Sequence, residues 1–181
     1  METYDALLDA AENVVIEKGS ANLTLELVAK KAKVSKGGLL YHFPSKKALI
    51  QAMIHRMIER FDKKMEKQME KDMRGPGKWV RAYIQSSIEP TGIGKKDLAA
   101  AGLLAAIATD PQLLEPLYQR YNIWRKKIAD DQILVEDAWI LTLAVDGLWL
   151  SDLMGFQAPK GKIRKRILQR MIDLSLTEPK S

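Results

Sequence analysis

The 181-residue chain lacks cysteine and has only two histidines, and each scarcity excludes a kind of chemistry. Without cysteine there is no disulfide framework, thiolate metal site or thiol nucleophile. His42 and His55 are thirteen residues apart and have no acidic residue between them, so we expect neither a metal nor a cofactor. Because a glycine-rich phosphate loop and a serine-centred elbow are also missing, we expect that the chain is not an enzyme.

Long apolar runs are missing too. The most apolar stretch, residues 138–154, contains Asp146 and Asp152, and no window reaches 18 uncharged apolar residues, so we expect no membrane span. The N-terminal METYDALLDA has acids where a signal peptide has cations, which indicates a cytoplasmic protein. The remaining composition, 46% hydrophobic and 29% charged, is typical of a globular protein, and the net charge of +6 suits a polyanionic partner.

Acidic residues are absent from residues 27–58. The same stretch contains seven cations: Lys30, Lys31, Lys33, Lys36, Lys46, Lys47 and Arg56. A charge run alone is more often a solvated face. In a chain with 23 acids, however, such a window on two short helices indicates a nucleic-acid-binding surface.

Two helix starts lie close together in residues 33–49, KVSKGGLLYHFPSKKAL. Ser35 and Ser45 are suited to cap helices, and a two-turn helix is expected between them, over residues 36–43. Gly37 and Gly38 occupy its first turn, where each costs about 0.5–1 kcal/mol relative to alanine. We expect that glycine is present there because the backbone must approach another molecule closely.

The residues around this segment resemble the N-terminal DNA-binding domain of TetR-family transcriptional regulators. The resemblance covers about residues 5–50 and is carried by Leu23, Thr24, Leu25, Val28, Ala29, Ala32, Val34, Ser35, Gly37, Leu39 and residues 41–46 (YHFPSK). Two positions depart from the family pattern: Lys33 stands where glycine is usual, and Leu40 where tyrosine is usual.

The resemblance implies an all-α fold of about nine helices. A three-helix helix-turn-helix domain is expected over residues 1–47, and a helical ligand-binding and dimerisation domain over residues 48–181. In such a domain the second helix of the pair enters the DNA major groove. The predicted DNA-contacting residues are Thr24, Ser35, Lys36, Gly37, Gly38, Leu39, Tyr41, His42 and Lys46, with base readout expected from residues 35–39.

A fourth helix is predicted from Ser45 to the break at residues 75–77. Its apolar residues recur every four positions: Leu49, Met53, Met57, Phe61, Met65, Met69 and Met73. Each step of four drifts by about 40°, so the row winds around the helix and no single partner covers it. We expect its start to pack against the DNA-binding helices and its end against other elements. It either carries motion between two domains or is a plain spacer.

Residues 79–89, 98–109 and 111–128 are predicted to form three further helices, the last of them bent at Pro116. Their aromatic residues line either a ligand cavity or an ordinary core. The candidate ligand-binding residues, including two from the next helix, are Tyr83, Leu104, Ile107, Tyr121, Trp124, Trp139 and Asp146.

The last two helices, over residues 132–154 and 162–176, are expected to form a four-helix bundle with a second copy of the chain, as in the family's dimers. Gly147 would let another backbone approach. Asp146 lies among Leu143, Leu148 and Trp149, so its carboxylate must find a partner. Three possibilities remain open: a cationic ligand, a group across the dimer, or water. The basic residues 160–170 are expected to be a solvated face.

These features predict a dimeric, ligand-responsive DNA-binding regulator of transcription. We expect a repressor that an unidentified small-molecule inducer releases from a near-palindromic double-stranded DNA operator, with no membrane partner. The alternative is a helical partner-binding or membrane-surface protein without sequence-specific DNA binding. That alternative leaves the two closely spaced helix starts in residues 33–46 unexplained.

Overall fold

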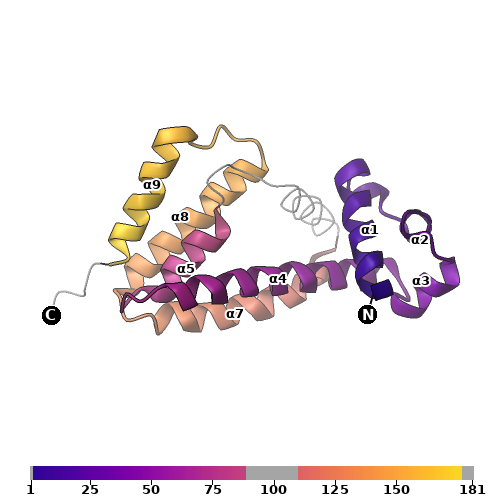
Figure 1. Ribbon diagram of the computed structural model, residues 1–181, viewed down its shortest axis with the longest axis horizontal. Helices are drawn as coiled ribbons and strands as arrows, with labels where there is room; N and C mark the ends of the chain where they lie inside the picture. Colours follow the sequence, from indigo (N-terminus) through magenta and orange to yellow (C-terminus); the bar gives the residue numbers. More distant parts are fainter. Residues whose placement is uncertain (1, 89–109, 177–181) are drawn as a thin grey trace. The chain divides into compact units, whose positions relative to one another are not determined.

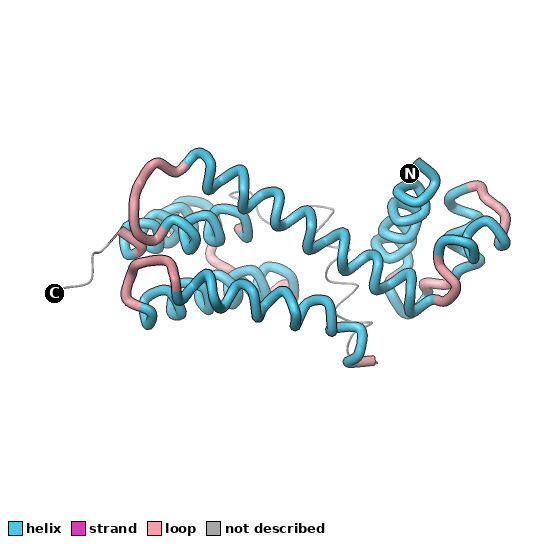
Figure 2. The backbone as a smooth tube through the Cα atoms, turned by 90° about the horizontal axis from the view of Figure 1, so that it is seen from below, coloured by secondary structure: helices cyan, strands magenta, loops and turns pink. Residues whose placement is uncertain are grey.

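The computed structural model describes residues 2–88 and 110–176. In these residues the chain is all-α, with no strand (Figure 2), as predicted. The elements of Figure 1 are α1 (Glu2–Lys18), η1 (Ser20–Asn22), α2 (Leu25–Ala32), α3 (Lys36–His42), α4 (Lys46–Lys71), α5 (Lys78–Ser87), η2 (Pro111–Leu114), α7 (Glu115–Ala129), α8 (Val135–Leu153) and α9 (Gly161–Leu174). The helix predicted over residues 98–109, with Leu104 and Ile107, lies outside the described residues.

Side-chain caps fix the helix starts near the N-terminus. The hydroxyl of Thr24 accepts a hydrogen bond from the amide of Leu27 at 3.2 Å, and that of Ser35 from Gly38 at 3.0 Å. Ser45 caps α4 in the same way, accepting from the amide of Ala48 at 3.1 Å. Each cap satisfies an amide of a first turn that has no partner within its helix. The predicted starts of α2, α3 and α4 are confirmed.

Two predicted helices differ from those observed. α4 ends at Lys71, and Met73, the last residue of the predicted apolar row, is 91% exposed. Pro116 does not bend a helix. It lies in the first turn of α7, preceded by the short 3₁₀ helix η2, because proline fits a first turn, where its missing N–H is not needed.

The described residues form two compact units. The first contains residues 2–58 and 110–119, and the second contains residues 59–88 and 120–176, so α4 and α7 each contribute to both. The predicted boundary at residue 47 stays a prediction. In the first unit α1 packs against α2, and the core is formed by Leu7, Leu8, Ala11, Val14, Leu23, Val28, Leu39, Phe43, Leu49, Met53 and Ile54.

In the second unit α5 is the central helix (Figure 1). Seven of its ten residues are buried, and it packs against both α8 and α9. The core also includes Met65 of α4, Trp124 and Ile128 of α7, Val145 of α8 and Met171 of α9. The apolar row of α4 thus supplies Leu49 and Met53 to one core and Met65 to the other, which confirms that no single partner covers the row.

Candidate nucleic-acid interface and effector region

The turn between α2 and α3 is closed by backbone hydrogen bonds around Lys33. Lys33 is left-handed, with φ 56° and ψ 38°. Its amide donates to the carbonyl of Lys30 at 3.2 Å, and the amide of Val34 donates to Ala29 at 3.0 Å. This pair of bonds is the Schellman arrangement that usually has glycine at the left-handed position. The chain turns sharply enough for Ser35 to start α3 three residues after α2 ends.

The N-terminal tip of α3 faces outward. Ser35, Lys36, Gly37 and Gly38 are all exposed. A Cβ atom added to Gly37 would have no heavy-atom neighbour closer than 4.0 Å, whereas one on Gly38 would lie 3.3 Å from the capping hydroxyl of Ser35. The fold therefore gives a steric reason for glycine at position 38 but none at position 37.

Two aromatic side chains follow the tip, with different surroundings. Tyr41 is 86% exposed, an uncommon position for a large ring and one available to a partner. His42 is half-buried, with ring centroids 6.1 Å from Tyr4 and 5.2 Å from Tyr41. Neighbouring rings thus hold His42 in place, while Tyr41 extends outward.

The prediction for Leu39 needs correction. Its side chain is fully buried in the first core, together with Val28 and Phe43, and cannot read a base edge. Leu39 and Phe43 are one helical turn apart, so both lie on the inward face of α3. The residues predicted for base readout reduce to those at positions 35–38.

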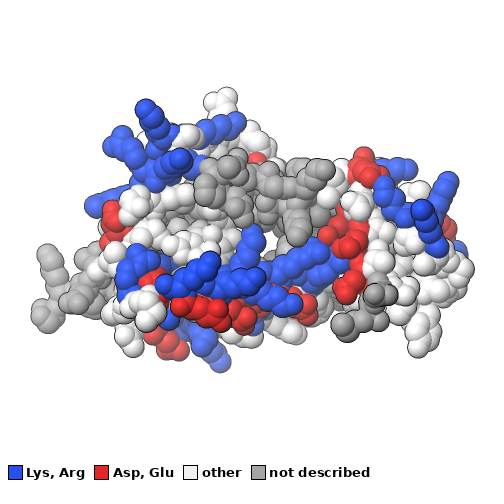
Figure 3. Space-filling model, viewed as in Figure 1, with Lys and Arg blue, Asp and Glu red and all other residues white. Residues whose placement is uncertain are grey.

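Acids from outside the acid-free stretch pair with four of its seven cations. Lys31 binds Glu17 at 2.6 Å, Lys36 binds Glu26 at 2.5 Å and Lys47 binds Asp110 at 3.4 Å. Arg56 binds both Asp9 and Glu12. In the space-filling view carboxylates lie beside the cations of this unit (Figure 3).

The remaining three cations, Lys30, Lys33 and Lys46, have no ion pair with a described residue. Of these three, Lys46 is the first residue of α4, next to its capping serine. The sequence window therefore overstates the free positive charge near α3.

An aromatic cluster fills part of the second unit. The ring of Tyr83 stacks on Trp79 at 5.3 Å and meets Phe61 edge-on at 5.6 Å. Trp124 lies 5.2 Å from Phe61 and 5.0 Å from Tyr121. Three of the predicted ligand residues, Tyr83, Tyr121 and Trp124, thus lie together in this cluster. Phe61 and Trp79 were not among the predicted ligand residues, although Trp79 and Tyr83 have the four-residue spacing of one helical face.

Asp146 of α8 joins this cluster. The hydroxyl of Tyr83 donates to its Oδ1 at 2.5 Å. Burial raises the pKa of Asp146, against the opposing effect of that hydrogen bond. Burial also raises the pKa values of Tyr83 and Tyr121, and the nearby carboxylate adds to both shifts. Both phenols therefore stay protonated donors at neutral pH.

Trp139, another predicted ligand residue, makes no ring contact with this aromatic cluster, and its role in ligand binding stays a prediction. Its side chain is 37% exposed on the outward face of α8, beside Ile140 and Leu143. Positions 139 and 143 are one turn apart, so the outward face continues past Trp139.

A separate groove of about 410 Å³ is lined by Lys64, Gln68, Ile84, Gln85, Ser86, Ile88, Leu168 and Ile172, none of them a predicted ligand residue.

Two family models match the chain. The model described as "Bacterial regulatory proteins, tetR family" matches residues 7–53, and the model described as "Tetracyclin repressor-like, C-terminal domain" matches residues 77–176. Together they cover most of the chain. The chain belongs to the TetR family. It is therefore a helix-turn-helix transcriptional regulator, and its family is one of regulators rather than enzymes.

Curated relatives match this TetR-family protein over a short stretch of the chain. The A-factor receptor protein of Streptomyces griseus is 36% identical over 52 residues, which are 29% of this chain and 19% of that protein. The HTH-type transcriptional regulator SrpR of Pseudomonas putida is 37% identical over 51 residues, 28% of this chain and 24% of that protein. The match thus spans a quarter or less of each relative's length.

Solved structures match this TetR-family protein along almost its whole length. A protein from Rhodococcus sp. described as a TetR-family transcriptional regulator has a TM-score of 0.78 at 22% identity, over 98% of this chain and 100% of that one. A transcriptional regulator from Saccharomonospora viridis in complex with choline has a TM-score of 0.75 at 18% identity, over 95% and 96%. At these identities the likeness shows the fold.

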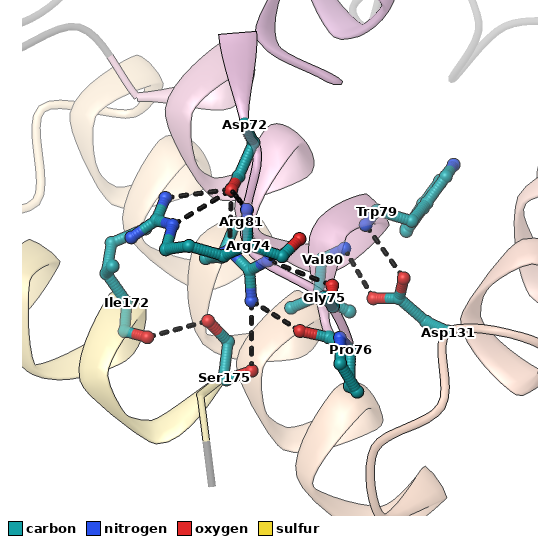
Figure 4. A network of polar contacts seen from close by, with 10 residues as sticks. All are labelled: Asp72, Arg74, Gly75, Pro76, Trp79, Val80, Arg81, Asp131, Ile172 and Ser175. Atoms are coloured by element: carbon teal, nitrogen blue, oxygen red, sulfur yellow. Dashed lines mark hydrogen bonds and ion pairs between the residues drawn. The ribbon is translucent and has the colours of Figure 1, made fainter. Parts of the chain in front are cut away.

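A polar network at the start of α5 was not predicted from the sequence (Figure 4). Arg81 is fully buried, and its Nε donates to Asp72 at 2.6 Å. Its terminal nitrogens donate to the backbone carbonyls of Arg74, Gly75, Pro76 and Ser175. The second arginine of the network, Arg74, also binds the Asp72 carboxylate.

Asp131, two residues after the end of α7, caps the start of α5. Its carboxylate accepts hydrogen bonds from the amides of Trp79 and Val80 at 2.8 Å each. Gly77, with φ +80°, completes the junction, because a Cβ there would overlap the carbonyl oxygen of Ser175. These contacts fix the position of α5, and with it Trp79 and Tyr83 of the aromatic cluster.

Two further kinds of feature are absent from the described part of this TetR-family protein. No helix there is both long and apolar enough to cross a bilayer. Nor do three or more His, Asp or Glu side chains gather there in a way that would hold a metal ion.

Proposed function

We propose that this TetR-family protein is a dimeric repressor that binds a near-palindromic operator and is released by a small molecule. The observation that carries the proposal is the tip of α3, where four successive residues, 35–38, are exposed and a glycine at position 37 has no structural requirement. Such a tip lets backbone amides approach a phosphate or base edge closely.

The DNA-binding roles divide between positioning and readout. Thr24 and Ser35 each accept a capping bond and retain a hydroxyl hydrogen that can be donated to a phosphate. Tyr41 and Lys46 extend outward and suit phosphate contacts, with His42 beside them. Lys36 would give up its ion pair with Glu26 and contact DNA instead. With few Arg, Asn or Gln side chains on α3, much of the sequence preference would come from DNA shape.

The dimer would form through α8 and α9. α8 has large apolar side chains on its outward face: Ile140 is 61% exposed and Leu143 is 62% exposed. Exposed apolar residues of this size, gathered on one helix, mark an interaction surface. α9 adds Ile163 and Leu174, both exposed. Two copies would bring two α3 tips to successive major grooves about 34–36 Å apart.

The effector would bind beside Tyr83, Tyr121, Trp124 and Asp146. α4 provides the physical link, since one uninterrupted helix contributes to the core of both units. An effector shifts the protein towards a non-binding arrangement only by its difference in affinity for the two states. The domain division at residue 47 and the role of α4 as a lever belong to this proposal.

The test is selection of bound duplexes from a random pool with the full chain. We expect enrichment of a two-fold symmetric site with half-sites about 10 base pairs apart. A Gly37→Asp variant places a negative charge at the open tip and should enrich nothing. Ala21→Asp adds the same charge at an exposed position outside α3 and should enrich the same site as the wild type. Enrichment of no symmetric site by the wild type would favour the partner-binding or membrane-surface alternative.

A further inference from the structure

We propose that the effector of this protein is a monovalent organic cation, with the Asp146 carboxylate as its counter-ion and the rings of Tyr83, Tyr121 and Trp124 around it. This inference rests on the proposed function, because it names the class of molecule that the effector region takes.

Four other acids with limited exposure in the second unit each have a cation or backbone amides as partners, and a fifth, Asp137, lies in the first turn of α8, where the helix dipole favours a carboxylate. Asp72 binds Arg74 and Arg81, and Asp152 binds Arg164 at 2.6 Å. Asp62 binds Arg120 at 2.6 Å, and Asp131 accepts from two backbone amides. The fold therefore neutralises its sheltered carboxylates as a rule, as the high free energy of an unpaired buried charge requires.

Asp146 departs from this rule. Its one hydrogen bond to a described residue comes from the neutral hydroxyl of Tyr83, and that bond uses only one of its two oxygens. No lysine or arginine among the described residues forms an ion pair with it. The side chain is half-buried, so its charge is sheltered without being sealed from an incoming molecule.

The surroundings of Asp146 select the kind of cation. Tyr83, which binds the carboxylate, contacts three other rings, and Trp124 lies against Tyr121 and Phe61, so Asp146 adjoins a cluster of rings from α4, α5 and α7. The faces of such rings attract ammonium groups and their apolar substituents. A single carboxylate among rings lacks the several oxygen ligands that a calcium or magnesium ion needs. A quaternary ammonium or phosphonium ion fits both features.

The experiment is isothermal titration calorimetry of the full chain without DNA. The probes are phenyltrimethylammonium and tetraphenylphosphonium, with tetraphenylborate as an anion of the same size and shape as the latter. We expect saturable binding of at least one cation, one per chain. Asp146→Asn keeps the volume and the bond from Tyr83 while removing the charge, and should weaken cation binding about tenfold or more.

Two further variants complete the test. Asp137→Asn removes a carboxylate from the first turn of the same helix and should leave the affinity for the cations unchanged. Tyr121→Leu removes an aromatic wall without changing charge and should weaken binding of the cations several-fold. This second variant serves in case Asp146→Asn does not fold, which circular dichroism would reveal.

The proposal is overturned if neither cation binds, if Asp146→Asn binds them as tightly as the wild type, or if tetraphenylborate binds as tightly as tetraphenylphosphonium. It is also overturned if Asp146→Asn sediments as a monomer while the wild type is a dimer, since Asp146 would then pair across subunits. A chain that selects a symmetric DNA site but ignores the cations retains the proposed function and loses this inference. A chain that binds the cations but selects no symmetric DNA site keeps the cation site and loses the proposed function.

Discussion

At Gly37, the effects of a substitution on the fold and on the proposed DNA binding can be measured separately. Position 37 is exposed in the first turn of α3, and an added Cβ meets nothing closer than 4.0 Å. Gly37→Ala should therefore raise the free energy of unfolding by about 0.5–1 kcal/mol, because alanine has the higher helix propensity. The same methyl group should weaken DNA binding by facing the groove. Urea denaturation and a gel-shift titration measure the two effects, and a variant that gains stability with unchanged affinity would place the DNA elsewhere.

Lys33 holds a backbone conformation that suits glycine better. At φ 56° and ψ 38°, a residue with a Cβ costs about 1–2 kcal/mol. Lys33→Gly and Lys33→Ala remove the same charge, so the difference between them isolates the backbone. We expect the glycine variant to exceed the alanine variant in free energy of unfolding by about 1 kcal/mol, measured by urea denaturation. Equal stabilities would mean that the turn is not left-handed in solution.

At the scale of elements, α5 depends on the Asp72–Arg81 contact. The bond from Arg74, then that from Arg81, lowers the pKa of Asp72 below its ordinary value of 3.8, against the effect of burial. A lowered pKa means that the folded state favours the ionised form. This stabilisation is complete above the unfolded pKa and is lost as the pH falls through the folded one.

Asp72→Asn should therefore lower the free energy of unfolding at pH 7 by about 3–5 kcal/mol, because it leaves the fully buried Arg81 without its carboxylate. Its deficit relative to the wild type should shrink as the pH is lowered from 4 towards 2. Denaturant titrations at pH 7, 4 and 3 measure this, with Asp173→Asn, at an exposed position on α9, as the control. A deficit that is independent of pH would show that the charge of Asp72 is not the cause.

The elements differ in how much of them the sequence predicts. The starts of α2, α3 and α4 are predictable because a capping hydroxyl and the amide it accepts from are three residues apart. The burial of Arg81 cannot be predicted from the sequence, because a charged residue is expected at the surface. One of the carbonyls that accept its hydrogen bonds, that of Ser175, lies 94 residues further along the chain. In the candidate site the same limit applies to Leu39, since the inward face of a seven-residue helix depends on the elements packed against it.

At the scale of the whole molecule, the proposed dimer interface includes the outward face of α8, where Ile140 and Leu143 are exposed. Gly147 is exposed there, between Leu143 and Leu150, and a Cβ added to it would have no neighbour within 4 Å in one subunit. A side chain at this position therefore leaves the fold of the single chain undisturbed. In a helix interior, replacing glycine even favours the helix.

Gly147→Glu should consequently yield a folded monomer, because its carboxylate would have to be buried without a partner in the proposed α8–α9 interface. Sedimentation velocity measures the change in assembly, and circular dichroism confirms that the helices remain. Ile123→Glu adds the same charge to an exposed apolar position on α7 and should remain dimeric. Should Gly147→Glu sediment as the wild type does while Ile123→Glu dissociates, the interface would lie on α7, and the spacing of the two α3 tips would follow from that helix instead.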